Sequence, residues 1–249
     1  MMFFRVMTLV GFFALFFAAP AGAADNFTPA QTKELERIVH DYIVKHPEVL
    51  MEAIQAAEEK EKADKVAKAE QSIRDQDKAL YHDPESQIGG NPNGDVTIVE
   101  FFDYRCPYCK QVQPILEGLL DSDRKLRIVY KEFPILGPAS TYASKIALAS
   151  RAQGKYDAFH RAMMDTKGSI DEKVVDKVAR SVGIDLAKAK ADMDAPAIEA
   201  LIKKDFALAD AINVNGTPAF VIAGKLYPGA MTLDELKKLI ADARQAHAG

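Results

Sequence analysis

The feature that most constrains this chain is the tetrapeptide Cys106-Pro107-Tyr108-Cys109, which stands between an apolar run and a helical pattern. Residues 96–102 predict a buried strand by their apolar content. A helix is expected from the cysteine motif to near Leu120, and residues 126–133 predict a second strand. Because a strand, a helix and a strand follow in this order, we expect a parallel pair of strands joined by a right-handed crossover. This unit indicates an α/β fold.

Helices are predicted for the next segment, residues 138–212. Gly154 is expected at the end of one helix, where glycine commonly forms a C-cap. The residues from Ser169 to Glu172 resemble a capping box at the start of another helix. Asp185 is expected to cap a third, shorter helix.

Two further strands and a final helix are expected after these helices. Residues 219–223 and the neighbouring Leu226-Tyr227 predict the strands, with Gly224 at the turn between them. Thr232 and Glu235 have capping-box spacing and precede an amphipathic pattern. The C-terminal part therefore predicts a sheet flanked by helices.

The first 23 residues are typical of a secretory signal peptide. Arg5 is the single early positive charge, an apolar stretch follows from Val6 to Ala19, and Ala21-Gly22-Ala23 provides small residues before the expected cleavage point. The apolar run has about 14 residues, fewer than the roughly 20 needed to span a bilayer. Export predicts a periplasmic location, in which disulfides persist.

Residues 24–84 predict a helical arm. Thr28, Pro29 and Gln31 form a capping box with proline at the first helical position, and Pro47 interrupts the helix. The apolar positions that follow at helical spacing are Leu35, Ile38, Val39, Tyr42, Ile43, Val49, Leu50, Ala53, Ile54 and Ala57. The arm is either a surface helix folded back on its own domain or a self-association element, since an apolar helix ahead of a highly charged one needs a partner surface.

The second half of the arm is rich in alanine and charge. Residues 58–78 contain no Gly or Pro and favour a long solvated helix. Val66, Ile73 and Leu80 have heptad spacing, although the positions between them are weakly apolar. Pro84 and the residues from Gly89 to Gly94 interrupt the pattern, so we expect the boundary of the next domain, residues 85–249, near residue 84.

Composition excludes several classes of protein. With 48% hydrophobic and 27% charged residues, the chain is neither wholly disordered nor a multi-pass membrane protein. The net charge is −4, from 32 basic and 36 acidic residues. A nucleic-acid partner is not expected, because nucleic-acid binders normally carry a basic excess.

Four interpretations of the cysteine pair are open. A structural disulfide between Cys106 and Cys109 would close a very small loop and stabilise the chain by about 2 kcal/mol. A zinc site needs about four ligands, but there is no second cysteine pair and the five histidines are scattered. Two thiolates could bind Cu(I) transiently. The fourth and favoured interpretation is a redox dithiol, with no metal bound.

The redox interpretation follows from helix physics. If Cys106 opens a helix, its sulfur meets unpaired N–H groups and the positive end of the helix dipole. Both favour the thiolate, which is the form that attacks disulfides. Pro107 is tolerated there because its missing N–H is not needed. Cys109, one turn further on, is placed to resolve a mixed disulfide.

Two segments carry a resemblance to a known family. The run Val99 to Cys109 is similar to the active-site strand and helix of DsbA-type thiol–disulfide oxidoreductases, and Val214 to Phe220 resembles the loop that carries their cis-proline. The resemblance covers about residues 85–249. It implies a thioredoxin fold with an inserted helical domain, at about residues 138–212, and no prosthetic group.

The resemblance also implies roles for individual residues. Cys106 matches the nucleophile, Cys109 the resolving cysteine, and Pro107 and Tyr108 the dipeptide that tunes redox potential. Thr217 and Pro218 match the substrate-binding residue and the cis-proline, and Glu100 matches a buried acid that relays protons. Glu100 has an alternative interpretation as an acid at a strand edge. DsbA itself typically has His in place of Tyr108 and Val in place of Thr217, whereas threonine is found in isomerase-type relatives.

The arm resembles the N-terminal segment of ScsC-type thiol oxidoreductases, named for suppression of copper sensitivity, through the residues from His40 to Leu50. Some members trimerise through this segment, while others do not. The resemblance implies a disulfide isomerase or reductase acting on unfolded or misoxidised exported proteins, recycled by a membrane redox partner and assembled as a trimer. The alternatives are a monomeric DsbA-like dithiol oxidase and a Cu(I)-handling protein.

Overall fold

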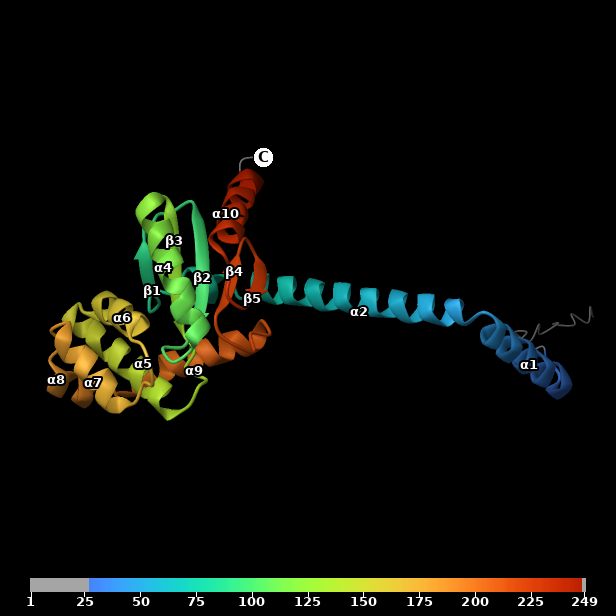
Figure 1. Ribbon diagram of the computed structural model, residues 1–249, viewed down its shortest axis with the longest axis horizontal. Helices are drawn as coiled ribbons and strands as arrows, with labels where there is room; N and C mark the ends of the chain where they lie inside the picture. Colours follow the sequence, from blue (N-terminus) through green and yellow to red (C-terminus); the bar gives the residue numbers. More distant parts are fainter. Residues whose placement is uncertain (1–26, 248–249) are drawn as a thin grey trace, which may run out of the picture. The chain divides into compact units, whose positions relative to one another are not determined.

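The computed structural model describes residues 27–247. The predicted signal peptide, residues 1–23, lies outside these residues. The chain divides between Lys60 and Glu61 into two compact units, which are described separately below (Figure 1).

The helices before and around the cysteine motif are α1 (Pro29–Lys45), α2 (Pro47–Asp75), α3 (Asp77–Tyr81) and α4 (Pro107–Ser122). The later helices are α5 (Pro138–Ser150), the 3₁₀ helix η1 (Arg151–Gln153), α6 (Tyr156–Asp165), α7 (Glu172–Ser181), α8 (Leu186–Asp192), α9 (Pro196–Ala211) and α10 (Leu233–His247). The strands are β1 (Gln87–Gly90), β2 (Val96–Phe102), β3 (Leu126–Glu132), β4 (Ala219–Ile222) and β5 (Lys225–Pro228).

In the first unit, α1 begins as predicted. The Thr28 side chain accepts a hydrogen bond from the Gln31 N–H, and the Gln31 side chain accepts one from the Thr28 N–H, which completes the capping box. Pro47 starts a new helix. No residue of α1 is buried, and its apolar positions, among them Leu35 and Tyr42, are about half exposed (49% and 54%). This unit therefore presents an apolar face without a core of its own.

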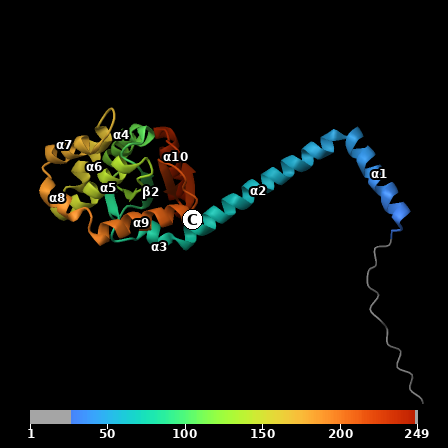
Figure 2. The ribbon, with the colours of Figure 1, turned by 90° about the horizontal axis from the view of Figure 1, so that it is seen from below.

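The second unit is built on a mixed five-stranded sheet with the order β1-β3-β2-β4-β5. β2 and β3 are parallel, as predicted from the strand–helix–strand pattern, and the other pairs are antiparallel. β2 is the central strand, which explains why its residues are nearly all buried. The five helices α5 to α9 are inserted between β3 and β4 and gather beside the sheet (Figures 1 and 2).

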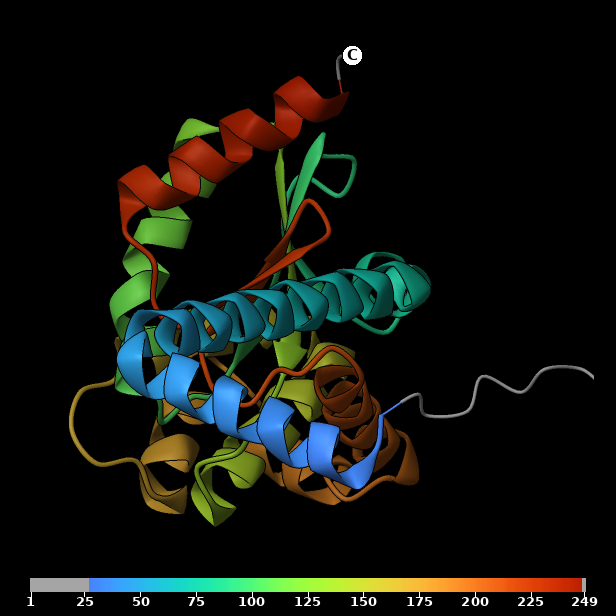
Figure 3. The same ribbon diagram turned by 90° about the vertical axis from the view of Figure 1, so that its right-hand side faces the viewer.

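Helices cover both faces of the sheet. On one face, Ile98 and Phe102 pack with α4, with α10 and with the helical insertion. On the other face, Val99 and Phe101 pack with residues of α9 and with Ile73 of α2. Figure 3 shows α4 and α10 on one side of the strands and α9 on the other. The start of α4, where the cysteine motif lies, is thereby fixed between the sheet and the insertion.

The end of the predicted arm belongs to the second unit. Ile73 and Leu80 are buried in its core at 1% and 0% exposure, whereas Val66 is 52% exposed. Lys131 of β3 is also fully buried, and its ammonium donates to the Ala79 carbonyl (2.8 Å) and the Ser86 hydroxyl (2.6 Å). The compact unit thus begins at Glu61, although the sequence suggested a domain boundary near residue 84.

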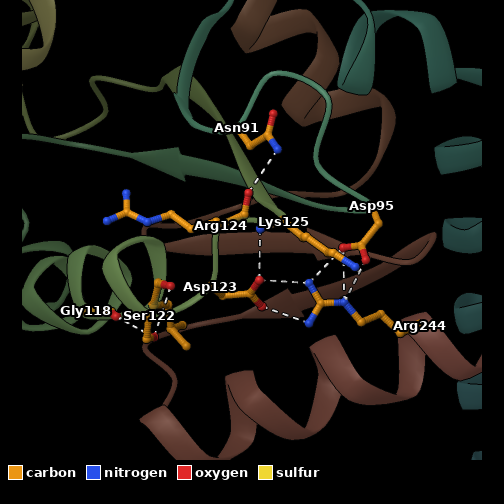
Figure 4. Close-up of polar contacts among 9 residues, drawn as sticks. Asn91, Asp95, Gly118, Ser122, Asp123, Arg124, Lys125 and Arg244 are labelled. Atoms are coloured by element: carbon orange, nitrogen blue, oxygen red, sulfur yellow. Dashed lines mark hydrogen bonds and ion pairs between the residues drawn. The ribbon is translucent and has the colours of Figure 1, made fainter.

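Arg244 ties the C-terminal helix to the sheet. Its guanidinium donates to both carboxylate oxygens of Asp95, just before β2, and to both of Asp123, just after α4 (Figure 4). In the same region the Asn91 side chain donates to the Arg124 carbonyl (2.9 Å). These contacts hold together the ends of α4, α10 and β2 on the side of the sheet away from the cysteine motif.

Three local expectations differ from the structure. The helix after Ser169 is capped by Asp171, whose side chain accepts from the Val174 N–H, so the predicted capping box at Ser169 was wrong. The long charged helix ends at Asp75, and a short helix follows after Gln76. No strand was expected at β1, because Gly89 and Gly90 stand in a run of residues typical of turns. These glycines fit because a side chain at Gly90 would collide with Leu126 backbone, within 2.6 Å.

Candidate functional site: a dithiol opposite a cis-proline

Cys106 opens α4, as the sequence predicted. β2 ends at Phe102, three loop residues follow, and Cys106 is the N-cap of α4 with extended backbone angles. Its N–H donates to the Asp103 carbonyl (3.0 Å), and Pro107 occupies the first helical position. Cys106 is 3% exposed. The free N–H groups of the first turn therefore lie next to its sulfur.

The environment of Cys106 favours its thiolate. A hydrogen bond from the Cys109 thiol lowers the pKa of Cys106 most, and the Thr217 side chain and the N–H groups of Cys109 and Tyr108 lower it further. These interactions outweigh burial and bring the pKa to about 5. The direction agrees with the thiolate expected from the sequence, but the second cysteine contributes more than the helix terminus.

Cys109 has the opposite character. It is fully buried, and burial, the hydrogen bond to Cys106 and the nearby carboxyl of Glu100 all raise the pKa of its thiol. Both cysteines are free thiols in the structure. The pair is therefore asymmetric, with one sulfur that is ionised at neutral pH and another that keeps its proton.

The predicted cis-proline loop lies against the dithiol. The Thr217–Pro218 peptide bond is cis, as expected. The Cys106 sulfur lies 3.1 Å from the Thr217 carbonyl oxygen, which brings together residues 111 positions apart in sequence. The Pro218 carbonyl accepts from the Gly229 N–H (2.8 Å), so the loop is anchored to the end of β5. Binding of substrate by Thr217 and Pro218 stays a prediction.

Glu100 lies in the middle of the sheet. In register it stands opposite Tyr130 of β3 and Phe220 of β4, so the alternative of an acid at a strand edge was wrong. The carboxyl is fully buried, and no donor among residues 27–247 reaches either oxygen. Burial, followed by the nearby Cys106 charge, raises the pKa of Glu100 to about 8. A proton on this carboxyl is therefore exchangeable near neutral pH.

The dipeptide between the cysteines faces outward. Pro107 is exposed and Tyr108 is 59% exposed. Tyr108 cannot act as a cation next to the thiolate, as the histidine of DsbA-type motifs can. Its position allows contact with a bound chain, and tuning of the redox potential by this dipeptide stays a prediction.

Two polar residues at the site were given no role by the sequence. Asp103, at 0% exposure, accepts hydrogen bonds from the Arg105 N–H (2.7 Å), the Leu136 N–H (2.9 Å) and the Ser140 hydroxyl (2.7 Å). Lys110 donates to the Met163 and Met164 carbonyls at the end of α6, and burial lowers the pKa of its ammonium to about 8. Apart from the Arg105 N–H, their partners lie between β3 and β4, at least 33 positions away in sequence, so no local sequence signal pointed to these contacts.

Within the described residues, no group of three or more His, Cys, Asp or Glu side chains is arranged to hold a metal ion. Among the helices of residues 27–247, none is both long and apolar enough to cross a membrane.

Two family profiles match the chain. The DSBA-like thioredoxin domain matches residues 97–241, and the copper resistance protein ScsC N-terminal domain matches residues 31–64. Among curated proteins, thiol:disulfide interchange protein DsbA of Bordetella parapertussis is 26% identical over 167 residues, 61% of this chain and 78% of DsbA. The Na(+)/H(+) antiporter NhaA 1 of Salinispora arenicola is 26% identical over 164 residues, but this chain spans 25% of the antiporter's length.

The similar solved structures are also a thioredoxin-like protein and an ScsC protein. A thioredoxin-like oxidoreductase from Silicibacter pomeroyi is 45% identical, with a TM-score of 0.66, over 68% of this chain and 97% of its own. A linker-deletion variant of Proteus mirabilis ScsC is 26% identical, with a TM-score of 0.68, over 90% of this chain and 100% of its own.

Thioredoxin-fold dithiol proteins are the class that this sheet, its helix-opening cysteine and the facing cis-proline define. Because the DSBA-like profile covers more than half of the residues, the chain belongs to the DSBA-like thioredoxin family. It also carries an ScsC-type N-terminal domain. The predicted fold, a DsbA-like thioredoxin domain with a helical insertion and a helical N-terminal segment, is confirmed.

Proposed function

We propose that the protein is an exported thiol–disulfide oxidoreductase that isomerises or reduces disulfides in other exported proteins. The asymmetry of the dithiol carries the proposal. The pKa of Cys106 is lowered to about 5, while burial raises the pKa of Cys109. An ionised sulfur can attack a disulfide, and a protonated neighbour can wait to resolve the product.

The reaction starts with the Cys106 thiolate. It attacks one sulfur of a substrate disulfide, so that a Cys106–substrate disulfide forms, the substrate S–S bond breaks and one substrate thiolate leaves. Isomerisation follows if another substrate thiolate attacks the mixed disulfide and releases Cys106, with no net change in oxidation. Reduction follows if Cys109 attacks Cys106, which leaves a Cys106–Cys109 disulfide and a second substrate thiol.

The reductive branch needs a proton acceptor, because Cys109 must lose its proton before it attacks. Glu100 is suited to this role because it is buried and has no hydrogen-bond donor among the described residues, and because its charge is close enough to raise the pKa of Cys109. With a pKa near 8, the carboxyl can both accept and return a proton near neutral pH.

Two observations favour the isomerase or reductase over a monomeric oxidase. Threonine precedes the cis-proline at the dithiol, as in isomerase-type relatives. The first unit presents an exposed apolar face, which suits assembly of several copies. In an assembly, several dithiols act on one substrate at high effective concentration. A membrane redox partner would then return the oxidised pair to the dithiol.

Trapping of mixed disulfides tests this proposal. The Cys109→Ala variant, exported in cells, should accumulate adducts through Cys106 to exported proteins, while the Cys106→Ala variant should accumulate none. Alkylation of the wild-type protein should show a reduced resting state. A mainly oxidised resting state would favour the dithiol oxidase. Binding of one Cu(I) per chain that blocks alkylation, without any adducts, would favour copper handling and contradict the proposal.

A further inference from the structure

The loop in front of Cys106 is fastened to the end of β3 by a buried hydrogen bond that the reaction scheme does not use. We propose that Tyr104 is a positioning residue for the nucleophile, because its hydroxyl ties this loop to Glu132 and thereby keeps Cys106 at the first turn of α4. The inference rests on the proposed function and adds to it a residue outside the dithiol that affects the ionisation of Cys106.

Tyr104 is built into the core rather than the surface. It is fully buried, two positions before Cys106, and its ring packs edge-on against Phe102 and Phe159, with centroids 5.1 and 6.0 Å away. Phe102 is the last residue of β2, and Phe159 lies in α6. The ring is therefore held by apolar contacts, and the hydroxyl is free to serve a separate purpose.

The Glu132 carboxyl accepts hydrogen bonds from three hydroxyl groups. This carboxyl, at the end of β3, is 2% exposed. Its Oε1 accepts from the hydroxyls of Tyr104 (3.2 Å) and Tyr156 (2.7 Å), and its Oε2 accepts from that of Ser144 (2.6 Å). Burial raises the pKa of Glu132 to about 8, while these hydrogen bonds lower it. An acid in such a position must be held by its partners, since it has no access to water.

The three donors come from different parts of the fold. Ser144 lies in α5 and Tyr156 in α6, so both bind Glu132 from the insertion. Tyr104 alone among the three lies in the loop that leads to Cys106. Among the three hydrogen bonds to Glu132, only the Tyr104 contact therefore links β3 directly to the loop that holds the nucleophile.

The same hydroxyl also faces a neutral histidine. His160 Nδ1 lies 3.3 Å from the Tyr104 oxygen, and His160 Nε2 lies 3.4 Å from Gln113 Oε1 in α4. Burial and the charges of Arg161 and Lys110 lower the pKa of His160 to about 3, so the ring stays uncharged. Because the Tyr104 hydroxyl donates its single proton to Glu132, it can only accept from His160, through Nδ1–H. The Nε2 atom of the uncharged ring then has no proton to donate to Gln113. The hydroxyl therefore connects the loop to β3 and to α6.

Release of this loop should affect Cys106 directly. The Cys106 N–H is bonded to the Asp103 carbonyl in the same loop, and the Cys106 sulfur depends on the N–H groups of Tyr108 and Cys109. If the loop moves, the sulfur leaves these donors and its thiolate loses stabilisation. A residue that acts only on folding would not shift the ionisation of the nucleophile.

The three donors provide a matched experiment. Tyr104→Phe, Tyr156→Phe and Ser144→Ala each remove one hydroxyl from Glu132 in the full chain. The Cys106 pKa is followed by thiolate absorbance against pH, and the redox potential is measured against glutathione. Tyr104→Phe should raise the Cys106 pKa by roughly 0.5 to 1 and make the protein less oxidising. Tyr156→Phe and Ser144→Ala should leave the Cys106 pKa and the redox potential unchanged. They should lower the unfolding midpoint by about as much as Tyr104→Phe does.

Two results would overturn the proposal. One is an unchanged Cys106 pKa in Tyr104→Phe, and the other is an equal shift in all three variants, which would indicate a general loss of packing. If Tyr104→Phe does not fold, Glu132→Met removes the acceptor of all three hydroxyls and should raise the Cys106 pKa, whereas the double variant Ser144→Ala with Tyr156→Phe should leave it unchanged. No shift in that variant contradicts the proposal. These titrations need no substrate, so they test Tyr104 even if the trapping experiment fails.

Discussion

At the residue scale, the first prediction concerns the ionisation of Cys106. Thiolate absorbance of the reduced protein should rise with a midpoint near pH 5, well below the ordinary thiol value of 9.0. Cys109→Ala should raise this pKa, since the Cys109 thiol lowers it most. Because the folded pKa is depressed, the thiolate stabilises the reduced protein fully above about pH 9, and this contribution is lost as the pH falls through 5.

Cys106→Ala is the control for this titration and should remove the low-pH transition. The rate of attack on a small disulfide should fall in parallel below pH 5, because the nucleophile becomes protonated. A Cys106 pKa of about 8 or higher, close to that of an ordinary thiol, would refute its assignment as the nucleophile.

The second prediction separates activity from stability at Glu100. Glu100→Gln keeps the shape of the side chain but cannot accept a proton, so resolution by Cys109 at pH 7 should slow by roughly tenfold or more. The folded pKa of about 8 lies above the ordinary 4.5, so the acid stabilises the fold most below pH 4.5 and this contribution is lost as the pH rises through 8. The variant should therefore be more stable than the wild type at pH 9.

Stopped-flow measurement of mixed-disulfide resolution and urea unfolding at pH 5 and pH 9 check both parts. Asp121→Asn, at an exposed acid on α4, is the control and should change neither quantity. Normal resolution kinetics in Glu100→Gln would show that another group accepts the Cys109 proton.

At the element scale, the third prediction concerns the segment that joins the arm to the catalytic unit. Ile73→Ala and Leu80→Ala should each lower the free energy of unfolding by about 2–5 kcal/mol, because both side chains are buried. Val66→Ala, at the preceding heptad position, should change it by less than about 0.5 kcal/mol, because Val66 is 52% exposed. Urea unfolding measures all three, and equal small effects would remove the segment from the core.

The sequence predicted the elements whose pattern is local. Val96 to Phe102 is an apolar run, and it forms the central strand. The caps at Thr28 and Thr232 depend on residues three positions away and were correct. β1 was missed because it is formed by pairing with β3, a tertiary contact that the local sequence around Gly89 and Gly90 does not indicate. Burial of Ile73 and Leu80 was missed for the same reason, since their heptad spacing also suits a solvated helix.

The candidate site divides in the same way. Cys106 and Cys109 were found from their spacing, and Thr217 and Pro218 from a resemblance in a short loop. Two side-chain contacts of the loop before Cys106 join residues 28 and 37 positions apart, Tyr104 with Glu132 and Asp103 with Ser140. No periodicity or motif encodes such a pair. Its chemistry is visible only once the chain has folded.

At the scale of the whole molecule, the two units differ in whether they have a hydrophobic core. The second unit has its own core and contains the dithiol, the cis-proline loop and Glu100. The first unit has an apolar face but no buried residue in α1. Covering such a face contributes about 25 cal/mol per Å², and this gain is the physical basis for the proposed assembly through the first unit.

The last prediction is that residues 24–60 assemble the protein as a trimer. Light scattering on the mature chain from Ala24 should give three copies, whereas a chain starting at Glu61 should be a monomer. The cut belongs at residue 61 rather than near Tyr81, because Ile73 and Leu80 lie in the core of the catalytic unit. The shortened chain should retain dithiol oxidase activity and lose isomerase activity, since several linked dithiols act on one substrate.

A matched pair of full-length variants separates assembly from truncation. Leu35→Glu with Ile38→Glu places two charges on the exposed apolar face of α1 and should abolish the trimer. Lys33→Glu with His40→Glu places two carboxylates on the opposite, polar face and should leave it intact. Isomerase activity should be lost in the Leu35→Glu, Ile38→Glu variant and retained in the Lys33→Glu, His40→Glu variant. If the mature chain is already a monomer at micromolar concentration, assembly through this face is refuted, and the monomeric oxidase becomes the better account of the dithiol.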